Sequence, residues 1–217
     1  MSSTKEKVIL EKSIDYLGAM ILIGNKCLMF RCVDENEYYK HGYFFPGCKV
    51  NDKYESTSYL IAQLKAKYGL DAKIGRFIGD TVTVENDEKM CLYLFKCTID
   101  KAVSINNKAV SFLLVDPKEP GNIIIDKADK LLLERISYFI KVYQGDFNTP
   151  KRPESDIKTI MTLYNTLVKN QDKVAKQDIN DFKQLLETNA TLKEITEAFQ
   201  YVLKRSKITL EGDNNEK

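Results

Sequence analysis

A Pro-Gly turn, a polar loop and a short amphipathic helix, all within residues 42–70, constrain this chain more than any other stretch. The turn follows two aromatic residues, in the order Phe-Phe-Pro-Gly at 44–47. Pro fixes one backbone angle and Gly permits angles that other residues avoid, so the pair predicts a sharp change of direction. Apolar residues then recur at helical spacing over 56–68, and Gly69 predicts the end of a helix there. The side chains expected to be buried on this helix are Leu60, Ile61, Leu64 and Tyr68.

Residues 48–70 resemble, without a gap, the signature of the Nudix hydrolase family. That signature reads Gly, five residues, Glu, seven residues, and then Arg-Glu-aliphatic-any-Glu-Glu-any-Gly-aliphatic. The aliphatic Leu64 and the closing Gly69-Leu70 are kept. The chemically important positions are changed: the first Gly is Cys48, the first Glu is Tyr54, the Arg-Glu pair is Ala62-Gln63, and the Glu-Glu pair is Ala66-Lys67.

In the family, carboxylates on one helix face hold Mg²⁺ against a pyrophosphate. Here Gln63, Ala66 and Lys67 stand at i, i+3 and i+4, so they share that face. Mg²⁺ takes oxygen ligands and is usually bound through carboxylates. An amide, a methyl group and an ammonium do not supply them. The resemblance therefore implies the fold and argues against the activity, with no catalytic residue, no metal site and no cofactor.

Displaced acids could still restore a metal site. Glu55 stands one position after the first Glu of the signature, so a slip of one residue in the loop would bring it toward the cleft. The competing interpretation is a surface carboxylate favoured near a helix N-terminus. The other acids considered are Asp52, Asp80, Glu85 and Asp87, two of which belong to an expected hairpin turn.

A nucleotide could bind without being hydrolysed. Phe44 and Phe45 could stack a base. Lys49 and Lys67 could hold a phosphate as point charges. The competing interpretation places one Phe in the core and leaves the lysines in solvent.

Composition limits the protein class. A net charge of +2 with 43% hydrophobic and 29% charged residues is typical of a soluble globular protein, and it gives no general attraction for nucleic acid. No apolar run approaches the roughly 20 residues of a membrane span, and no secretory signal is evident at the N-terminus. The odd number of cysteines, five, predicts reduced thiols and a cytoplasmic or nuclear location. Zinc is not expected, because His41 is the only histidine and no short Cys pair exists.

The expected fold class is α/β, a Nudix-type α/β/α sandwich with a mixed sheet, followed by a small all-helical C-terminal region. Strands are expected at 18–23, 27–31, 72–78, 81–84, 90–95 and 110–115, and helices at 127–143, 155–168, 178–186 and 191–203. We expect a tail at 1–12, a Nudix-like domain at 13–145, a linker at 146–153, a helical region at 154–206 and a disordered tail at 207–217.

The function these observations favour is a non-catalytic binding or architectural subunit. The resemblance implies an assembly linked to RNA, because inactive Nudix folds recur in such complexes. The helical region, residues 154–206, is the expected site for a protein partner. Two alternatives remain open: a nucleotide sensor without hydrolysis, and a divergent hydrolase that uses displaced carboxylates such as Glu55.

Overall fold

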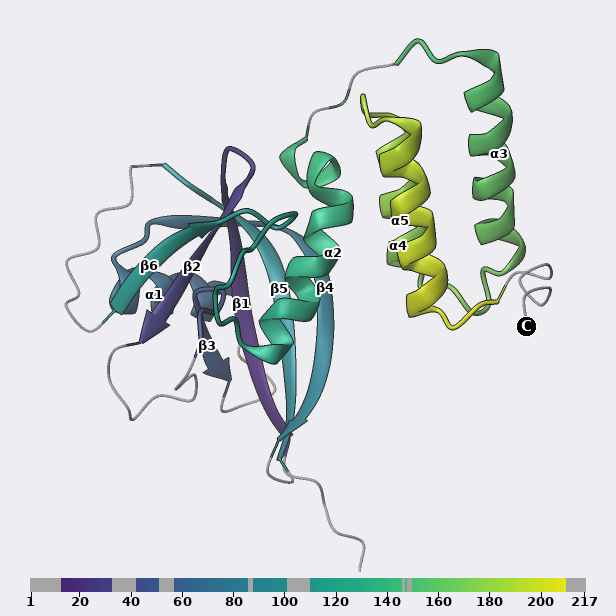
Figure 1. The fold of residues 1–217 in the computed structure, drawn as a ribbon. Coiled ribbons are helices and arrows are strands. Elements are labelled where there is room, and N and C mark those ends of the chain that lie inside the picture. The colour runs from purple at the N-terminus through teal and green to yellow at the C-terminus, as the bar shows by residue number, and fades with distance from the viewer. Residues whose placement is uncertain are drawn as a thin grey trace, which may run out of the picture. The chain divides into compact units, whose positions relative to one another are not determined.

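The structure is a computed structural model that describes residues 13–32, 42–50, 57–85, 88–100, 110–145, 147 and 150–209. The chain divides into two compact units. The sheet unit comprises Met1–Val115 and Pro120–Leu132, and the helical unit comprises Asp116–Glu119 and Leu133–Lys217. Figure 1 labels the strands and helices that belong to each. Tyr54, Glu55 and His41 lie outside the described residues.

Six strands form the sheet, in the order β4-β5-β1-β2-β6, with β3 paired to β1 beside this path. The strands are β1 (Ser13–Ile23), β2 (Lys26–Cys32), β3 (Gly47–Val50), β4 (Ala72–Glu85), β5 (Glu88–Ile99) and β6 (Val110–Val115). β1 runs parallel to β5 and antiparallel to β2 and β3. The sheet is therefore mixed, and β1 is its centre because it pairs with three other strands.

The long edge strand β4 differs from the prediction. The sequence analysis expects two strands, 72–78 and 81–84, but the structure has one strand that pairs with β5 along its length. The pairing register shifts between Ile74 and Phe77 and again between Phe77 and Gly79. Such irregularities let a strand bend without ending. Gly75 and Gly79 lie at these irregularities, so they mark a bend within one continuous strand and not a break between two.

Helix α2 (Lys127–Gln144) contains the division between the two units, since Leu132 belongs to the sheet unit and Leu133 to the helical unit. The boundary predicted between residues 145 and 146 lies a few helical turns after this division. The physical reason is that side chains of α2 after Leu133, such as Arg135, form hydrogen bonds and ion pairs with the helices that follow, as described below. Leu131, expected on the apolar stripe, is 43% exposed, whereas the other predicted stripe residues are buried: Leu132, Ile136, Phe139 and Ile140.

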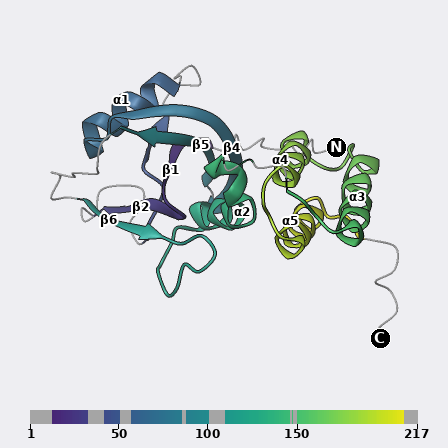
Figure 2. The same ribbon diagram turned by 90° about the horizontal axis from the view of Figure 1, so that it is seen from above.

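The helical unit adds α3 (Glu154–Lys169), α4 (Lys176–Leu186) and α5 (Leu192–Arg205) to the second part of α2. Figure 2 shows α3 packed beside α4 and α5. The spacing of Thr191 and Glu194 is typical of a capping box, and at the start of α5 the two residues bond reciprocally. Ser155 is of a type that often caps helices but does not cap α3, which begins after Pro153 without a side-chain cap. In the helical unit, the largest fully buried apolar side chains on α4 and α5 are Phe182 and Phe199.

The expected fold class, an α/β sandwich with a mixed sheet followed by a small helical region, is confirmed. The five cysteines, all within the described residues, are thiols that form no disulfide. Cys27, Cys48, Cys91 and Cys97 are buried and Cys32 is partly exposed. Burial raises the pKa of Cys97 to about 12, so this thiol stays protonated and behaves as a small apolar side chain. Within the described ranges, none of the helices is long and apolar enough to cross a membrane.

Candidate functional site

The backbone of residues 43–47, just before the polar loop, is held by its neighbours. The Phe44 N–H donates to the Phe30 carbonyl at 2.8 Å, and the Phe30 N–H donates back at 2.9 Å. The Ala19 N–H donates to the Pro46 carbonyl at 2.8 Å. The rings of Phe44 and Phe45 are completely buried. Both rings therefore belong to the core of the sheet unit, and neither is exposed to stack on a nucleotide base.

Gly47 is required by the close approach of β3 to β1. A Cβ atom at this position would lie 2.1 Å from the Leu17 carbonyl oxygen, a backbone atom that has no room to move. The Tyr68 hydroxyl, from the end of helix α1 (Thr57–Tyr68), donates to the Gly47 carbonyl at 3.3 Å. This hydrogen bond ties the last residue of α1 to the first residue of β3.

Helix α1 buries one face against the sheet. Leu60, Leu64 and Tyr68 are 0–2% exposed and stand four residues apart, so they form one stripe along the helix. The Tyr68 ring packs 4.8 Å from the Phe30 ring, measured between centroids. The predicted burial of these three side chains is confirmed, whereas Ile61 is only partly buried.

The end of α1 explains the Gly-Leu pair that closes the signature-like stretch. Gly69 adopts a left-handed conformation with φ of 68°, and its N–H donates to the Lys65 carbonyl at 3.0 Å. This is the αL motif of a helix C-terminus, for which glycine is favoured because it lacks a Cβ. Leu70 then returns to the core with 3% exposure. The pair ends the helix and anchors the chain as it leaves.

The other face of α1 carries the residues at the signature-like positions. Ala62 and Ala66 are exposed, and Gln63 and Lys67 are partly exposed. On the same helix, the exposed Lys65 ammonium lies 2.8 Å from an Asp71 carboxylate oxygen, and this hydrogen bond raises the pKa of Lys65. This face therefore presents an amide, methyl groups and ammonium groups, with no carboxylate among 62, 63, 66 and 67.

Of the remaining candidates, the structure describes Lys49 and Asp80 on separate strands. Lys49 is exposed on β3, next to the buried Cys48. Asp80 is exposed on β4. Asp52, Asp87 and the polar loop with Tyr54 and Glu55 lie outside the described residues. In the described part of the chain, three or more His, Cys, Asp or Glu side chains are nowhere grouped so that they could hold a metal ion.

Asp129, in the first turn of α2, is a polar contact that the sequence analysis missed. Its Oδ1 accepts a hydrogen bond of 2.7 Å from the Phe45 N–H, and its side chain is completely buried. Its Oδ2 has no partner among the described residues. Burial raises the pKa of Asp129 well above its usual value, opposed by the Phe45 hydrogen bond and reinforced by Asp126. An acid near a helix start is ordinary, so no local signal marks it as buried.

The helical unit contains a buried charged cluster around Arg135. The Arg135 guanidinium donates to Asp178, to Asp181 at 2.7 Å and to the Tyr143 hydroxyl at 3.1 Å. Arg205 adds a second cation, 3.2 Å from Asp178. Burial alone would lower the pKa of Arg135, but Tyr143 and the two carboxylates outweigh it and raise the pKa. The cluster joins α2 to α4 and α5 within the helical unit.

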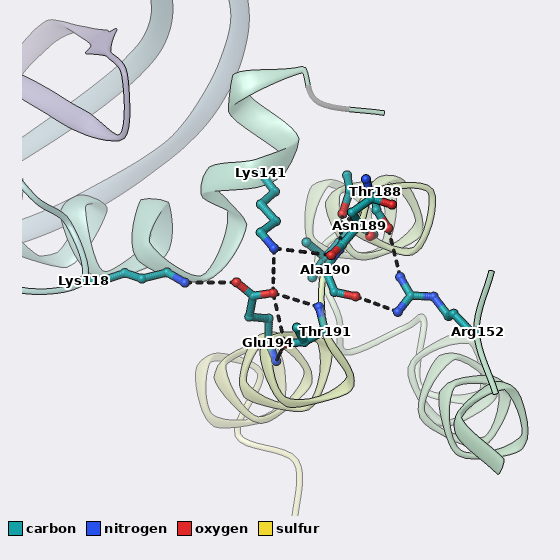
Figure 3. A network of polar contacts seen from close by, with 9 residues as sticks. Lys118, Lys141, Arg152, Thr188, Asn189, Ala190, Thr191 and Glu194 are labelled. Carbon is teal, nitrogen blue, oxygen red and sulfur yellow. Dashed lines mark hydrogen bonds and ion pairs between the residues drawn. The ribbon is translucent and has the colours of Figure 1, made fainter. Parts of the chain in front are cut away.

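A second polar network surrounds Glu194 at the start of α5 (Figure 3). Its carboxylate accepts from Lys141 at 2.7 Å, from Lys118 at 3.2 Å and from the Thr191 N–H at 2.8 Å. Burial opposes ionisation, but these donors prevail and lower the pKa of Glu194 to about 2. Arg152 holds the turn before α5 through the carbonyls of Thr188 and Ala190. The network fixes the α4–α5 turn.

The sequence matches no model of a protein family and no curated protein. Its structure is similar to solved structures. A MutT protein from Methanosarcina mazei Go1 aligns with 61% of this chain and 99% of its own length, at 17% identity and a TM-score of 0.53. The ORF135 protein of E. coli, at 18% identity, covers 61% of this chain and 94% of its own, with a TM-score of 0.49. A MutT Nudix hydrolase from Burkholderia pseudomallei, at 13% identity, covers 58% and 99%, with a TM-score of 0.48.

The similarity to the Methanosarcina protein covers all of that protein and leaves more than a third of this chain unmatched. At such low identity it establishes the fold and no more. The resemblance to the Nudix hydrolases is thereby confirmed for the fold.

Proposed function

We propose that this protein is a non-catalytic Nudix-fold subunit that binds a partner and does not hydrolyse a nucleoside diphosphate derivative. The observation that carries the proposal is the outer face of α1, where Gln63, Ala66 and Lys67 stand. This face offers no carboxylate to a divalent cation, and Lys67 would repel one. Pyrophosphate hydrolysis relies on metal ions to neutralise charge and activate water.

The fold around this face supports a binding function. Gly47, Tyr68 and the stripe on α1 hold the helix and the turn in a fixed arrangement. A rigid scaffold that keeps its shape while its metal-binding chemistry is absent is what an architectural subunit requires. The C-terminal helices, with a core of their own, supply the additional surface for a protein partner.

The proposal includes an assembly that contains RNA, as the resemblance implies. The net charge of +2 gives no general attraction for phosphates, so an RNA contact would pass through a partner protein or through local lysines such as Lys49. Native co-purification followed by mass spectrometry would identify the partner and any nucleic acid.

The test of the missing activity uses a variant that restores the carboxylates, Gln63→Glu with Ala66→Glu and Lys67→Glu. We expect the natural protein to show no Mg²⁺- or Mn²⁺-dependent turnover of ADP-ribose, dinucleoside polyphosphates or capped RNA. Its thermal melt should be unchanged by millimolar metal. The variant should melt higher with Mn²⁺, because a bound ligand stabilises the folded state by about 2.7 kcal/mol at a hundredfold excess over its dissociation constant.

Turnover by the natural protein that is abolished by a chelator and by Glu55→Gln would replace this proposal with a hydrolase that uses displaced acids. A rise in the melting temperature with nucleotides but no turnover would favour a nucleotide sensor. With Phe44 and Phe45 buried, that sensor would depend on Lys49 and Lys67.

A further inference from the structure

Helix α3 carries an apolar stripe on a side that is not packed against α4 or α5. Ile157 is 44% exposed and Met161 is 58% exposed, and Tyr164 and Val168 are partly exposed. These positions follow the spacing i, i+4, i+7 and i+11. At about 100° of rotation per residue they fall within roughly 60° of arc on the helix surface. They therefore form one continuous stripe along most of α3.

This stripe is distinct from the face that α3 contributes to the core. Ile160 and Leu167 are 7% and 0% exposed and lie on the neighbouring sector of the helix, which is the buried one. The sector opposite the stripe is polar and internally satisfied: the hydroxyls of Thr159, Thr162 and Thr166 each donate to the carbonyl four residues earlier. Exposed apolar side chains are thus collected in one sector and are not scattered around the helix.

The charges that flank the stripe are arranged asymmetrically along the helix. Glu154 stands at the N-terminal end, 3.2 Å from Lys158, and Lys169 stands at the C-terminal end, all on the same side of the stripe. Two copies of α3 packed antiparallel would place Ile157 opposite Val168 of the second copy and Met161 opposite Tyr164. In this register, Glu154 of each copy lies within about two residues, roughly 3 Å along the helix axis, of Lys169 of the other. A parallel two-fold pair would instead put the charged flanks of the two copies on opposite sides of the interface, where they could not pair with each other.

We infer that the exposed stripe of α3 is a self-association surface, on which a second copy of this chain docks its own α3 in antiparallel orientation. The arrangement of apolar positions and end charges is self-complementary, as a two-fold interface requires. The inference concerns the helical unit alone, so it stands or falls separately from the absence of hydrolysis in the sheet unit.

The expected dimer is weak. One pair of helices of this length, about 24 Å at 1.5 Å per residue, buries less than the roughly 1,200 Å² at the lower end of standard interfaces. The affinity should therefore be micromolar or weaker. Sedimentation equilibrium of the full chain from micromolar to near-millimolar concentration would measure it.

Met161→Glu places a charge in the centre of the stripe without touching the core. It should weaken dimerisation by at least about tenfold, because an unpaired charge would be buried against an apolar surface. Thr159→Glu adds the same charge to the opposite, polar side and should leave dimerisation unchanged. A natural protein that stays monomeric throughout the concentration series, or a dimer that responds equally to both substitutions, would overturn the inference.

A charge exchange tests the antiparallel register. Glu154→Lys and Lys169→Glu each place like charges opposite each other in a homodimer, so each variant alone should dimerise more weakly than the natural protein. Mixed in equal amounts, the two variants face each other with opposite charges at both ends and should recover dimerisation. Thermal melts of each variant alone check that α3 remains folded. A mixture no more dimeric than its components would show that the α3 helices do not pair in this way.

Discussion

Asp129 and Arg135 are both completely buried side chains of α2, six positions apart, yet their surroundings differ in kind. Asp129, in the sheet unit, has one backbone donor and one oxygen without a partner among the described residues. Arg135, in the helical unit, is paired with two carboxylates and a tyrosine hydroxyl. Burial favours the neutral form of an ionisable group unless opposite charges compensate for it.

The comparison teaches that burial has different consequences for the two groups. The pKa of Asp129 is raised, which favours its neutral, protonated form. The pKa of Arg135 is also raised, which favours its charged form, because carboxylates surround it. The sheet unit therefore contains an acid that ionises at a cost. In the helical unit, removal of the Arg135 charge would leave the Asp178 and Asp181 carboxylates buried without this partner, and burial would then oppose their ionisation too.

The largest expected effect is that of Arg135→Ala. It leaves Asp178 and Asp181 buried with a single remaining cation, Arg205, and should lower the free energy of unfolding by about 3–5 kcal/mol. Chemical denaturation measures this change. Arg205→Ala is the matched control, since that side chain is 35% exposed and makes one ion pair in the cluster, and it should cost about 1 kcal/mol or less.

A triple variant, Arg135→Met with Asp178→Leu and Asp181→Leu, separates pairing from packing. An apolar replacement of a whole buried cluster is often neutral or stabilising, so this variant should recover most of the loss. If Arg135→Ala costs no more than the control, the cluster would not be the element that joins α2 to α4 and α5.

An apolar position in the sheet unit calibrates these electrostatic effects. Leu64 is 0% exposed in the middle of the buried stripe of α1, and Leu64→Ala should cost about 2–5 kcal/mol. Ala62→Ser, on the exposed face of the same helix, should change stability by no more than about 0.5 kcal/mol. Equal small effects from both substitutions would mean that α1 does not use this face against the sheet.

The pH dependence of Asp129 sharpens the comparison. Its folded-state pKa is raised above the unfolded value of about 3.8, so its favourable contribution is full below that value and is lost as pH rises through the folded-state pKa. Asp129→Asn removes the titration. The stability of this variant relative to the natural protein should therefore increase with pH above about 4, by at most about 1.4 kcal/mol per pH unit. A relative stability that is flat from pH 4 to 8 would show that Asp129 is not titrating with a raised pKa.

Local signals in the sequence predicted the parts of the fold that depend on neighbours along the chain. The Gly69-Leu70 pair ends α1 as expected, and the Thr191–Glu194 spacing begins α5 as expected, because each motif is a bond pattern within a few residues. A nearly continuous apolar run over 18–23, followed by the turn residues Gly24-Asn25-Lys26, also located the hairpin of β1 and β2. Exact strand continuity in β4 was missed, because its pairing with β5 overrides the local signals.

Long-range chemistry could not be predicted in the same way. The apolar residues of α4 indicate its buried face only in part: Phe182 and Leu185 are buried, but Ile179 and Leu186 are partly exposed. The helix instead fully buries Asp178 and Asp181. The reason is Arg135, which lies 43 positions from Asp178 in the sequence and attracts the acidic face inward. Apolar periodicity assigns acids to the solvent side and contains no information about a distant cation. The candidate site was easier, because its argument depends on which residue types occupy 63, 66 and 67.

The smallest expected effect concerns Glu194, whose pKa is shifted in the opposite direction from that of Asp129. Its folded-state pKa is lowered from 4.5 to about 2 by Lys141, Thr191 and Lys118, against the opposing effect of burial. Its contribution is therefore present above pH 4.5 and is lost as pH falls toward 2. Glu194→Gln should destabilise the protein by about 0.5–2 kcal/mol near pH 7, the usual range for a helix cap, and this difference should shrink below pH 4.5.

Glu197→Gln, which removes only an exposed ion pair to Lys193 on the same helix, should have little effect at any pH. Denaturation midpoints from pH 2.5 to 7 for the three proteins would measure this. A Glu194→Gln difference that grows as the pH falls would contradict the assignment of Glu194 as an ionised cap. It would also contradict the contrast between a carboxylate whose ionisation is favoured, in the helical unit, and one whose ionisation is opposed by burial, in the sheet unit.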